Sequence, residues 1–209
     1  MEPVKRGASL RTEQAAQTRR RILHAATDVL TQHGFAAARI EDIAERAEVA
    51  VPTIYKAFSN KRNLLVGALN QALTDADSGT RIDDQLWWTE QLDERDPVRQ
   101  LQLVARNARR IYERSGALLS VLQAAVPVEA ELAAVWNDFA SQRLDRSRRT
   151  AISLARKAGT RARLSRDETA LTLMTLTDPA LFAAFTAHGK SAGRYETWLG
   201  DVLARALLD

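Results

Sequence analysis

The side chains best placed for chemistry lie on a short predicted helix that begins near residue 51. Ile54 and Phe58 share its apolar face, which leaves the opposite face to other groups. The side chains on that outer face are Val51, Pro52, Thr53, Tyr55 and Lys56. Hydroxyl and ammonium groups bind phosphate oxygens, and apolar groups can contact thymine methyl groups. This face therefore has the chemistry of a surface that contacts a nucleic acid.

A second predicted helix, residues 40–47, must position this surface. Its apolar residues recur at the i, i+3, i+4 and i+7 spacing of an amphipathic helix. They are Ile40, Ile43, Ala44 and Ala47. Residues 48–50 leave room only for a sharp turn, and Pro52 suits the first turn of the next helix. Two short helices joined in this way are typical of a helix-turn-helix.

The segment from Thr18 to Leu65 resembles the DNA-binding domain of the TetR family of transcriptional regulators. The matching residues are Ile22, Ala25, Ala26, Gly34, Phe35, Ile43, Ala44, Val49, Thr53, Ile54, Tyr55, Phe58, Lys61, Leu64 and Leu65. The helical remainder from Trp87 onward resembles the ligand and dimer domain of one branch of that family. The resemblance implies an all-α fold in two parts.

The resemblance also implies a function. The chain would be a homodimeric, ligand-responsive repressor that binds double-stranded DNA at a palindromic operator and is released by a small-molecule effector. By analogy with the family, the base-reading residues would be Val51, Pro52 and Lys56, and the phosphate-binding residues Thr53, Tyr55 and Lys61. An activator is not excluded. The alternative is a dimeric DNA-binding scaffold without an effector, its C-terminal cavity filled by its own side chains.

Four positions depart from the family pattern. Glu48 stands where the turn usually has glycine, and Ala50 where a serine usually caps the second helix. Arg39 replaces a threonine, and its positive charge could restore the phosphate contact that the threonine would make. Ala57 replaces a histidine or tyrosine. If Glu48 adopts the left-handed conformation, the turn is strained.

The distribution of charge changes near residue 65, where the resemblance to the DNA-binding domain ends. Residues 1–65 carry 11 Lys and Arg against 7 Asp and Glu, whereas residues 66–209 carry 19 of each. The basic excess favours a polyanionic partner for the N-terminal part alone. We therefore expect a flexible basic arm at 1–11, a DNA-binding domain at 12–65, and a helical effector and dimerisation domain at 66–209.

Several functional classes are disfavoured by the composition. No cysteine is present, which excludes disulfides and thiolate metal sites. No uncharged run approaches the roughly 18 residues of a membrane span, and no signal peptide is recognisable, so a cytoplasmic protein is expected. His24, His33 and His188 lie far apart, and no catalytic or phosphate-binding motif occurs. We expect no enzyme, cofactor or metal site.

Apolar spacing and capping residues predict helices throughout. The expected ranges begin with 12–33, 40–47, 51–58 and a helix after Asn60. An irregular acidic stretch at 78–97 follows, then helices from Pro97, at 116–126, 129–157, from Ser165, 178–189 and 191–208. Ser165 and Glu168 have the spacing of a capping box.

Arg143 lies among residues expected to face inward. On a helical wheel it points within about 20° of Trp136, Ser147 and Leu154. It could form an internal ion pair, with Glu113 as candidate partner, or bind an anionic effector. Several aromatic residues could line a cavity, although aromatic residues at helical spacing more often belong to the hydrophobic core. They are Trp87, Trp88, Tyr112, Trp136, Phe139, Phe182 and Phe185. The predicted pocket consists of Arg109, Tyr112, Trp136, Phe139, Arg143 and Phe182.

The predicted dimer interface uses the helices that follow Ser165 and Ser191. The apolar stripe of the last helix exceeds what a small bundle needs and would be exposed on a monomer. The predicted interface residues are Leu171, Met174, Tyr195, Trp198, Leu199, Val202, Leu203 and Ala206.

Overall fold

The computed structural model describes residues 4–74, 82–157 and 164–209, with side chains from residue 11 onward. The regular structure in these ranges is helical, which confirms the all-α fold class. The helices are α1 (Val4–Ala37), α2 (Ile40–Arg46), α3 (Val51–Phe58), α4 (Lys61–Thr74), the short 3-10 helix η1 (Ile82–Asp84), α5 (Leu86–Asp93), α6 (Pro97–Ala125), α7 (Ala130–Leu154), α8 (Arg166–Leu176), α9 (Pro179–Ala187) and α10 (Ala192–Leu207).

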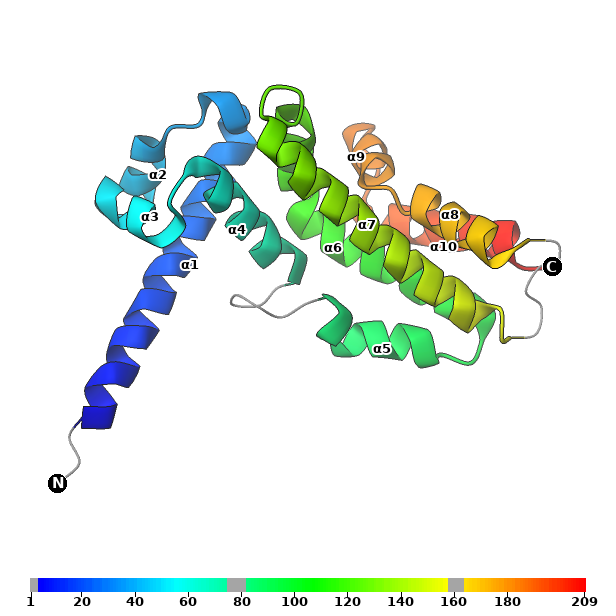
Figure 1. The fold of residues 1–209 in the computed structure, drawn as a ribbon. Helices are drawn as coiled ribbons and strands as arrows, with labels where there is room; N and C mark the ends of the chain where they lie inside the picture. The colour runs from blue at the N-terminus through cyan, green and yellow to red at the C-terminus, as the bar shows by residue number, and fades with distance from the viewer. Residues whose placement is uncertain (1–3, 75–81, 158–163) are drawn as a thin grey trace.

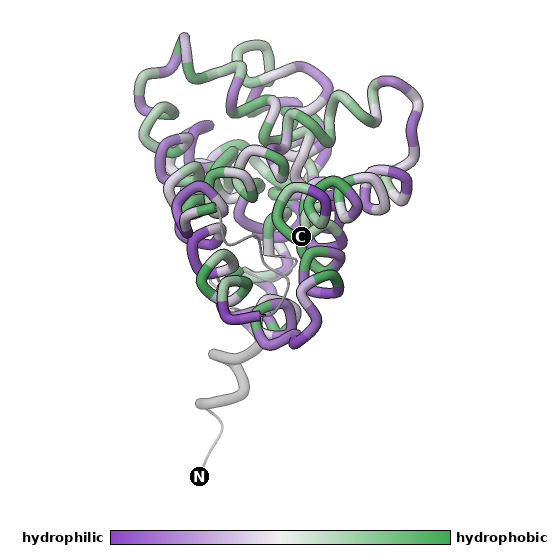
Figure 2. The backbone as a smooth tube through the Cα atoms, turned by 90° about the vertical axis from the view of Figure 1, so that its right-hand side faces the viewer, coloured by the Kyte–Doolittle hydropathy of each residue, from purple (hydrophilic) through white to green (hydrophobic). Residues whose placement is uncertain are grey.

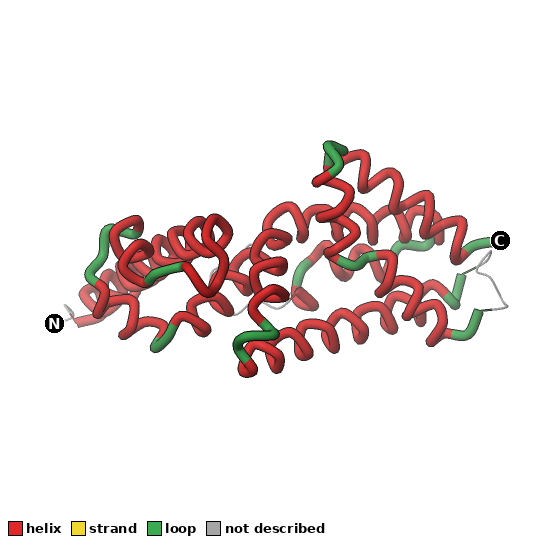
Figure 3. The backbone as a smooth tube through the Cα atoms, turned by 90° about the horizontal axis from the view of Figure 1, so that it is seen from above, coloured by secondary structure: helices red, strands yellow, loops and turns green. Residues whose placement is uncertain are grey.

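The helices form two groups joined by α4. Helices α1 to α4 lie at one end of the elongated molecule and α5 to α10 at the other (Figures 1 and 3). Helix α6 is central, because α1, α4, α9 and α10 all pack against it. Viewed toward the C-terminal end, hydrophobic and hydrophilic residues alternate along the helices (Figure 2). Each helix therefore presents an apolar face to its neighbours.

The N-terminal group is built on a small apolar core. Ile22, Leu30, Ile43, Ile54, Leu64 and Leu65 are each at most 1% exposed. Gly34 interrupts α1 with φ 74°, a conformation that favours glycine, and Phe35 then turns back into the core. Gly67 is needed for a close approach, because a Cβ there would lie 3.0 Å from Leu23 Cδ2.

Helix α1 begins earlier than predicted. The sequence prediction placed its start at Thr12 and a flexible arm before it, whereas the helix begins at Val4. The segment contains good helix formers and no proline after Pro3, so nothing in it stops the helix from extending. Residues 1–3 lie outside the described residues.

Two further boundaries were predicted wrongly. Helix α6 continues through Gly116, where a break was expected. A Cβ at Gly116 would lie 3.7 Å from the Phe182 ring, an ordinary packing distance, so the close packing of α9 does not require a glycine there. Part of the stretch predicted to be irregular is helical, because Trp88 and Gln91 of α5 bury one face at i, i+3 spacing.

The predicted capping box of α8 is confirmed. The Ser165 hydroxyl accepts a hydrogen bond from the Glu168 backbone N–H at 3.2 Å, and the Glu168 carboxylate accepts one from the Ser165 N–H at 2.8 Å. Donation to the carboxylate by the Ser165 backbone N–H, and by the Ser165 hydroxyl at 2.7 Å, lowers the pKa of Glu168. Among the described residues, one stretch, 166–187, is long and apolar enough by composition to cross a membrane. It is not one helix, because α8 ends at Leu176 and α9 begins at Pro179.

Glu48 has φ 53°, so it adopts the left-handed conformation in which strain is expected. We expect Glu48→Gly to stabilise the protein by about 0.5–1 kcal/mol, since relief of left-handed strain exceeds the added entropy of glycine. Thermal unfolding should show a midpoint about 2 °C higher. Glu48→Ala is the control: it also removes the carboxylate that lies 3.8 Å from Arg21, but keeps the strain. A lower midpoint for the glycine variant would contradict this account.

Candidate nucleic-acid interface and ligand cavity

Helices α2 and α3 form the helix-turn-helix. Ile43, Ile54 and Phe58 are at most 4% exposed and hold the two helices together and against α1 and α4. The turn is closed by hydrogen bonds from Glu48 N–H to Glu45 O at 3.0 Å and from Val49 N–H to Ala44 O at 3.0 Å. This packing fixes which face of α3 points outward.

The outward face of α3 carries the residues that the sequence predicted. Pro52, Tyr55 and Lys56 are exposed, with Tyr55 at 49%, and Val51 and Thr53 are half-buried. Ala50 precedes the helix without a side-chain cap, and its carbonyl accepts the Thr53 N–H at 2.8 Å. Helix α3, which carries these five residues, lies at the outer edge of the molecule (Figure 1).

Lys61 is partly engaged inside the protein. Its ammonium group donates to the carbonyls of Ala36 at 3.3 Å and Ala38 at 3.0 Å, and lies 4.7 Å from the Phe35 ring centre. An ammonium group has three N–H donors, so these contacts use two of them. Lys61 therefore has a structural role, joining the start of α4 to the segment after α1, besides any contact with phosphate.

Two arginines lie near the helix-turn-helix, and one of them has a structural role that the sequence did not reveal. Arg19 donates to the Ala57 carbonyl at 3.2 Å, and its guanidinium lies 4.2 Å from the Phe58 ring centre. It braces α3 against α1. Arg39, a predicted DNA contact, is exposed at the N-cap position of α2, 3.6 Å from the Glu41 carboxylate.

Arg143 forms an internal ion pair, but not with the predicted partner. Its Nη1 donates to Asp178 at 3.0 Å, and its Nη2 donates to the carbonyls of Met174 at 2.7 Å and Thr177 at 3.0 Å. Only 8% of Arg143 is exposed, so these bonds compensate its buried charge.

Glu113 was a wrong choice of partner because Arg109 already binds it. The two residues lie one turn apart on α6, the spacing at which opposite charges meet. Arg109 also donates to Glu196 of α10, and that hydrogen bond raises the pKa of Arg109.

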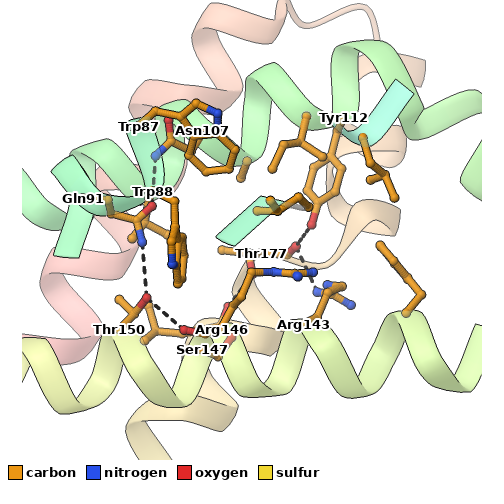
Figure 4. A pocket seen from close by; sticks show the side chains of 17 residues that line it. Trp87, Trp88, Gln91, Asn107, Tyr112, Arg143, Arg146, Ser147, Thr150 and Thr177 are labelled. Atoms are coloured by element: carbon orange, nitrogen blue, oxygen red, sulfur yellow. Dashed lines mark hydrogen bonds between the residues drawn. The ribbon is translucent and has the colours of Figure 1, made fainter. Parts of the chain in front are cut away.

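A cavity of about 90 Å³ lies between α5, α6 and α7, beside Arg143 (Figure 4). Its wall includes Leu73, Trp87, Trp88, Gln91, Asn107, Ile111, Tyr112, Phe139, Arg143, Arg146, Ser147, Thr150, Leu173 and Thr177. Three of the six predicted pocket residues, Tyr112, Phe139 and Arg143, are among them. The Tyr112 hydroxyl donates to the Thr177 carbonyl at 2.6 Å, and burial raises the pKa of Tyr112.

The other three predicted pocket residues do not line this cavity. Arg109 is held by its two carboxylates. Trp136 packs on the outer side of Phe139, at 5.9 Å between ring centres, and Phe182 lies between Tyr112 and Tyr195 at 6.0 and 5.1 Å. Trp136 and Phe182 therefore pack in the core. A helical-wheel projection shows that a side chain faces inward, but not whether it lines a pocket or fills the core.

The cavity has a polar end that sequence reasoning missed. Asn107 Nδ2 donates to Gln91 Oε1 at 3.0 Å, and Gln91 Nε2 donates to the Thr150 hydroxyl at 3.2 Å. The indole N–H of Trp88 is buried and has no hydrogen-bond partner among the described residues. The adjacent Trp87 and Trp88 were the only signal for this wall, because isolated amides do not stand out in a sequence.

The predicted interface stripe on α10 is only partly available. Tyr195, Leu199 and Leu203 are 0% exposed within one chain, so their assignment to a dimer interface was wrong. They lie on the side of α10 that packs against α6 and α9, and the broad apolar stripe serves that contact first. Leu171 is 53% exposed. The predicted residues that are half-buried are Met174, Trp198, Val202 and Ala206.

Comparison with known proteins agrees with this geometry. Residues 22–68 match the model for the family of bacterial regulatory proteins, tetR family. The HTH-type transcriptional repressor KstR of Mycolicibacterium smegmatis is 37% identical over 73 residues, which cover 35% of this chain and 36% of that protein. This chain thus spans about a third of the length of that curated relative.

Solved structures share the whole fold. NalD of Pseudomonas aeruginosa, the secondary repressor of a multidrug efflux pump, has a TM-score of 0.72 at 20% identity, covering 94% of this chain and 98% of that chain. A transcriptional regulator from Saccharomonospora viridis, solved in complex with choline, has a TM-score of 0.69 at 19% identity, covering 92% and 98%.

The two-part helical fold and the exposed second helix define a protein with an N-terminal helix-turn-helix. The family match lies on those same helices. Residues 22–68 are thus similar to the tetR family of bacterial regulatory proteins, and over the rest of the chain the similarity is one of fold.

The Arg143 ion pair predicts unequal effects of its two residues on stability. Asp178→Ala leaves a buried guanidinium without its charge partner and removes the cap of α9, so we expect a loss of about 2–4 kcal/mol. Arg143→Met leaves a carboxylate that is 42% exposed and can be hydrated, so we expect a loss below about 1.5 kcal/mol. Urea unfolding measures both, and the reverse order would refute the ion-pair account.

Proposed function

We propose that this protein is a homodimeric transcriptional repressor that binds a palindromic DNA operator and is released by a small-molecule effector. The observation that carries the proposal is the outer face of α3, where Pro52, Tyr55 and Lys56 are exposed on a helix anchored by buried Ile54 and Phe58. Such a rigidly held, mixed surface suits the major groove. The N-terminal basic excess supports the same partner.

Within this proposal residues 12–65 bind DNA and residues 66–209 hold the effector and the second subunit. Val51, Pro52 and Lys56 contact bases, and Thr53, Tyr55, Lys61 and Arg39 contact phosphates. The protein acts in the cytoplasm, where its DNA is.

An effector is supported by the cavity between α5, α6 and α7. It combines aromatic walls with the Trp88 indole N–H, which has no hydrogen-bond partner in the described part of the chain, and a purely structural core has no reason to keep this combination. The Saccharomonospora neighbour with choline bound shows that a protein of this fold has been solved with a small molecule. Binding at the cavity would change the separation of the two α3 helices, which must match half-sites about 34–36 Å apart.

The DNA-binding proposal predicts different effects for two residues of α3. Tyr55→Phe removes a phosphate contact and should weaken binding to all duplexes by about 1 kcal/mol per subunit. Lys56→Gln removes a base contact and should weaken binding to the preferred site more than to random DNA. Fluorescence anisotropy measures both, with a site obtained by in vitro selection. Lys190→Gln is the charge-matched control, because Lys190 lies at the far end, between α9 and α10. Equal affinity of both variants and the parent protein would contradict the assigned surface.

The dimer proposal uses the part of α8 and α10 that the single chain leaves accessible. Leu171, Trp198 and Val202 would pair across a two-fold axis, the symmetry that a palindromic operator requires. Sedimentation at micromolar concentration should give a dimer, and Leu171→Asp with Val202→Asp should give a monomer. Leu86→Asp is the control, because Leu86 is 82% exposed but lies on α5. A monomeric mass for the parent protein would overturn the proposal.

A further inference from the structure

Helix α1 begins well before the core that anchors it. The helix begins at Val4, whereas the first buried side chain along it, among those that the structure describes, is Ile22. Residues 11–17 are all exposed. The start of α1 projects past α2 and α3, away from the C-terminal half of the molecule (Figure 1). We call residues 4–21 the α1 extension.

The basic excess of the N-terminal part of the chain lies in this extension. Residues 4–21 contain six Lys and Arg and a single acidic residue. These residues are Lys5, Arg6, Arg11, Arg19, Arg20 and Arg21 against Glu13. Residues 22–65, which include the helix-turn-helix, contain five Lys and Arg and five Asp and Glu, so their net charge is zero. The positive field that favours a polyanion therefore comes from the α1 extension and not from α2 and α3.

Helical register places Arg11 on the face of α1 that is buried further along the helix. On a wheel of 3.6 residues per turn, Arg11 points within about 20° of Thr18 and Ile22. Ile22 is 0% exposed and belongs to the N-terminal core. The described backbone of α1 is helical up to Gly34, so the wheel applies along this whole stretch. The stripe that faces the core therefore continues beyond it as Thr18 and Arg11.

Two arginines connect the extension to the helix-turn-helix. Arg19 donates to the Ala57 carbonyl, at the end of α3, at 3.2 Å. Arg21 lies 3.8 Å from the Glu48 carboxylate, in the turn before α3. On the wheel, Arg11 points midway between these two arginines, about 80° from each. Arg11 therefore points to the side of α1 on which the helix-turn-helix lies.

Arg11 lies about two turns beyond these contacts. Eight residues separate Arg11 from Arg19, which corresponds to a rise of about 12 Å along the helix. The major groove of B-DNA is also about 12 Å wide, and a strand of phosphates borders it on each side. With α3 in the groove, Arg11 can therefore reach the phosphates at its edge.

The extension lacks the packing that usually stabilises a helix. Most helical stability in proteins comes from tertiary packing of one face, and isolated helices shorter than about 12–15 residues are marginal in water. Every one of residues 11–17 is exposed. A polyanion along the extension would reduce the repulsion among its cationic side chains and so stabilise the helix.

We propose that the α1 extension is a second DNA-binding surface, which holds the phosphate backbone at the edge of the groove that α3 occupies. Arg11 contacts phosphate from the face that the register defines, and the helix of the extension is stabilised when DNA is bound. This inference rests on the proposed function, since it adds a sequence-independent contact to the base contacts of α3.

Two arginines on opposite faces of the extension test the proposal. Arg20 is exposed and points about 180° from Arg11 on the wheel. Binding of the full-length protein is measured at several salt concentrations, with a duplex of roughly 30 base pairs, about three turns of DNA. Its sequence is arbitrary, because phosphate contacts carry no sequence information. Arg11→Gln should lower the slope of log affinity against log salt by about 0.9 per subunit, and Arg20→Gln by less than half as much.

Two neighbouring alanines give a second matched pair, which adds charge instead of removing it. Ala15 and Ala16 are both exposed, but Ala15 points about 40° from Arg11 and Ala16 about 140°. Ala15→Glu should weaken binding to the duplex at least about threefold more than Ala16→Glu, because its carboxylate faces the phosphates. Equal effects within either pair, or an unchanged salt slope for Arg11→Gln, would overturn the proposal.

Hydrogen exchange tests whether DNA stabilises the helix. Binding of the duplex should slow amide exchange at residues 11–17 in the parent protein, and much less in Arg11→Gln. Unchanged exchange in the parent protein would refute the contact. Tyr55→Phe and Lys56→Gln test the proposed function separately. If they weaken binding and Arg11→Gln does not, this inference fails alone, whereas a parent protein that binds no duplex contradicts both.

Discussion

The packing of α4 against both halves of the molecule is the constraint on which the rest depends. Leu64 and Leu65 are fully buried near the N-terminal core, and Gly67 lets α4 approach Leu23 and Phe58. Its far end meets α6 through Leu73 and the Arg114 contact at Ala72, and Arg62 at its start pairs with Glu131 of α7. Helix α4, with 14 residues, therefore contacts the N-terminal core at one end and α6 at the other. A displacement of one end must be accommodated at the other end.

The sequence was most informative where local physics decides the structure. Ile54 and Phe58 could be assigned to the inner face of α3 because helical periodicity leaves one alternative only, and burial of both confirms it. The cap at Ser165 and the positive φ at Glu48 likewise depend on neighbouring residues. Fold class and helix order could thus be predicted from the sequence, apart from the boundaries at Gly116 and Val4 and the unexpected α5.

The C-terminal assignments depended on contacts between distant residues, and these were less predictable. Tyr195, Leu199 and Leu203 formed a valid apolar stripe, but the stripe does not say whether α6 or a second subunit covers it. Arg143 was correctly placed inside, yet its partner Asp178 lies 35 residues away across the break between α8 and α9. Choosing between Glu113 and Asp178 required the tertiary arrangement.

The energetics of the cavity between α5, α6 and α7 bear on whether the protein is a scaffold or an effector-responsive regulator. The space of about 90 Å³ is partly open to the surface, and the side chains around it lack packing partners on that side. The buried indole N–H of Trp88, which has no partner in the ranges that the structure describes, lowers the stability of the fold by about 1–3 kcal/mol. Larger side chains at Ser147 or Ala108 would fill this space with ordinary core packing. A protein that needed only a rigid link between two DNA-reading helices would gain stability from such a change, and for this reason we propose that a ligand binds there.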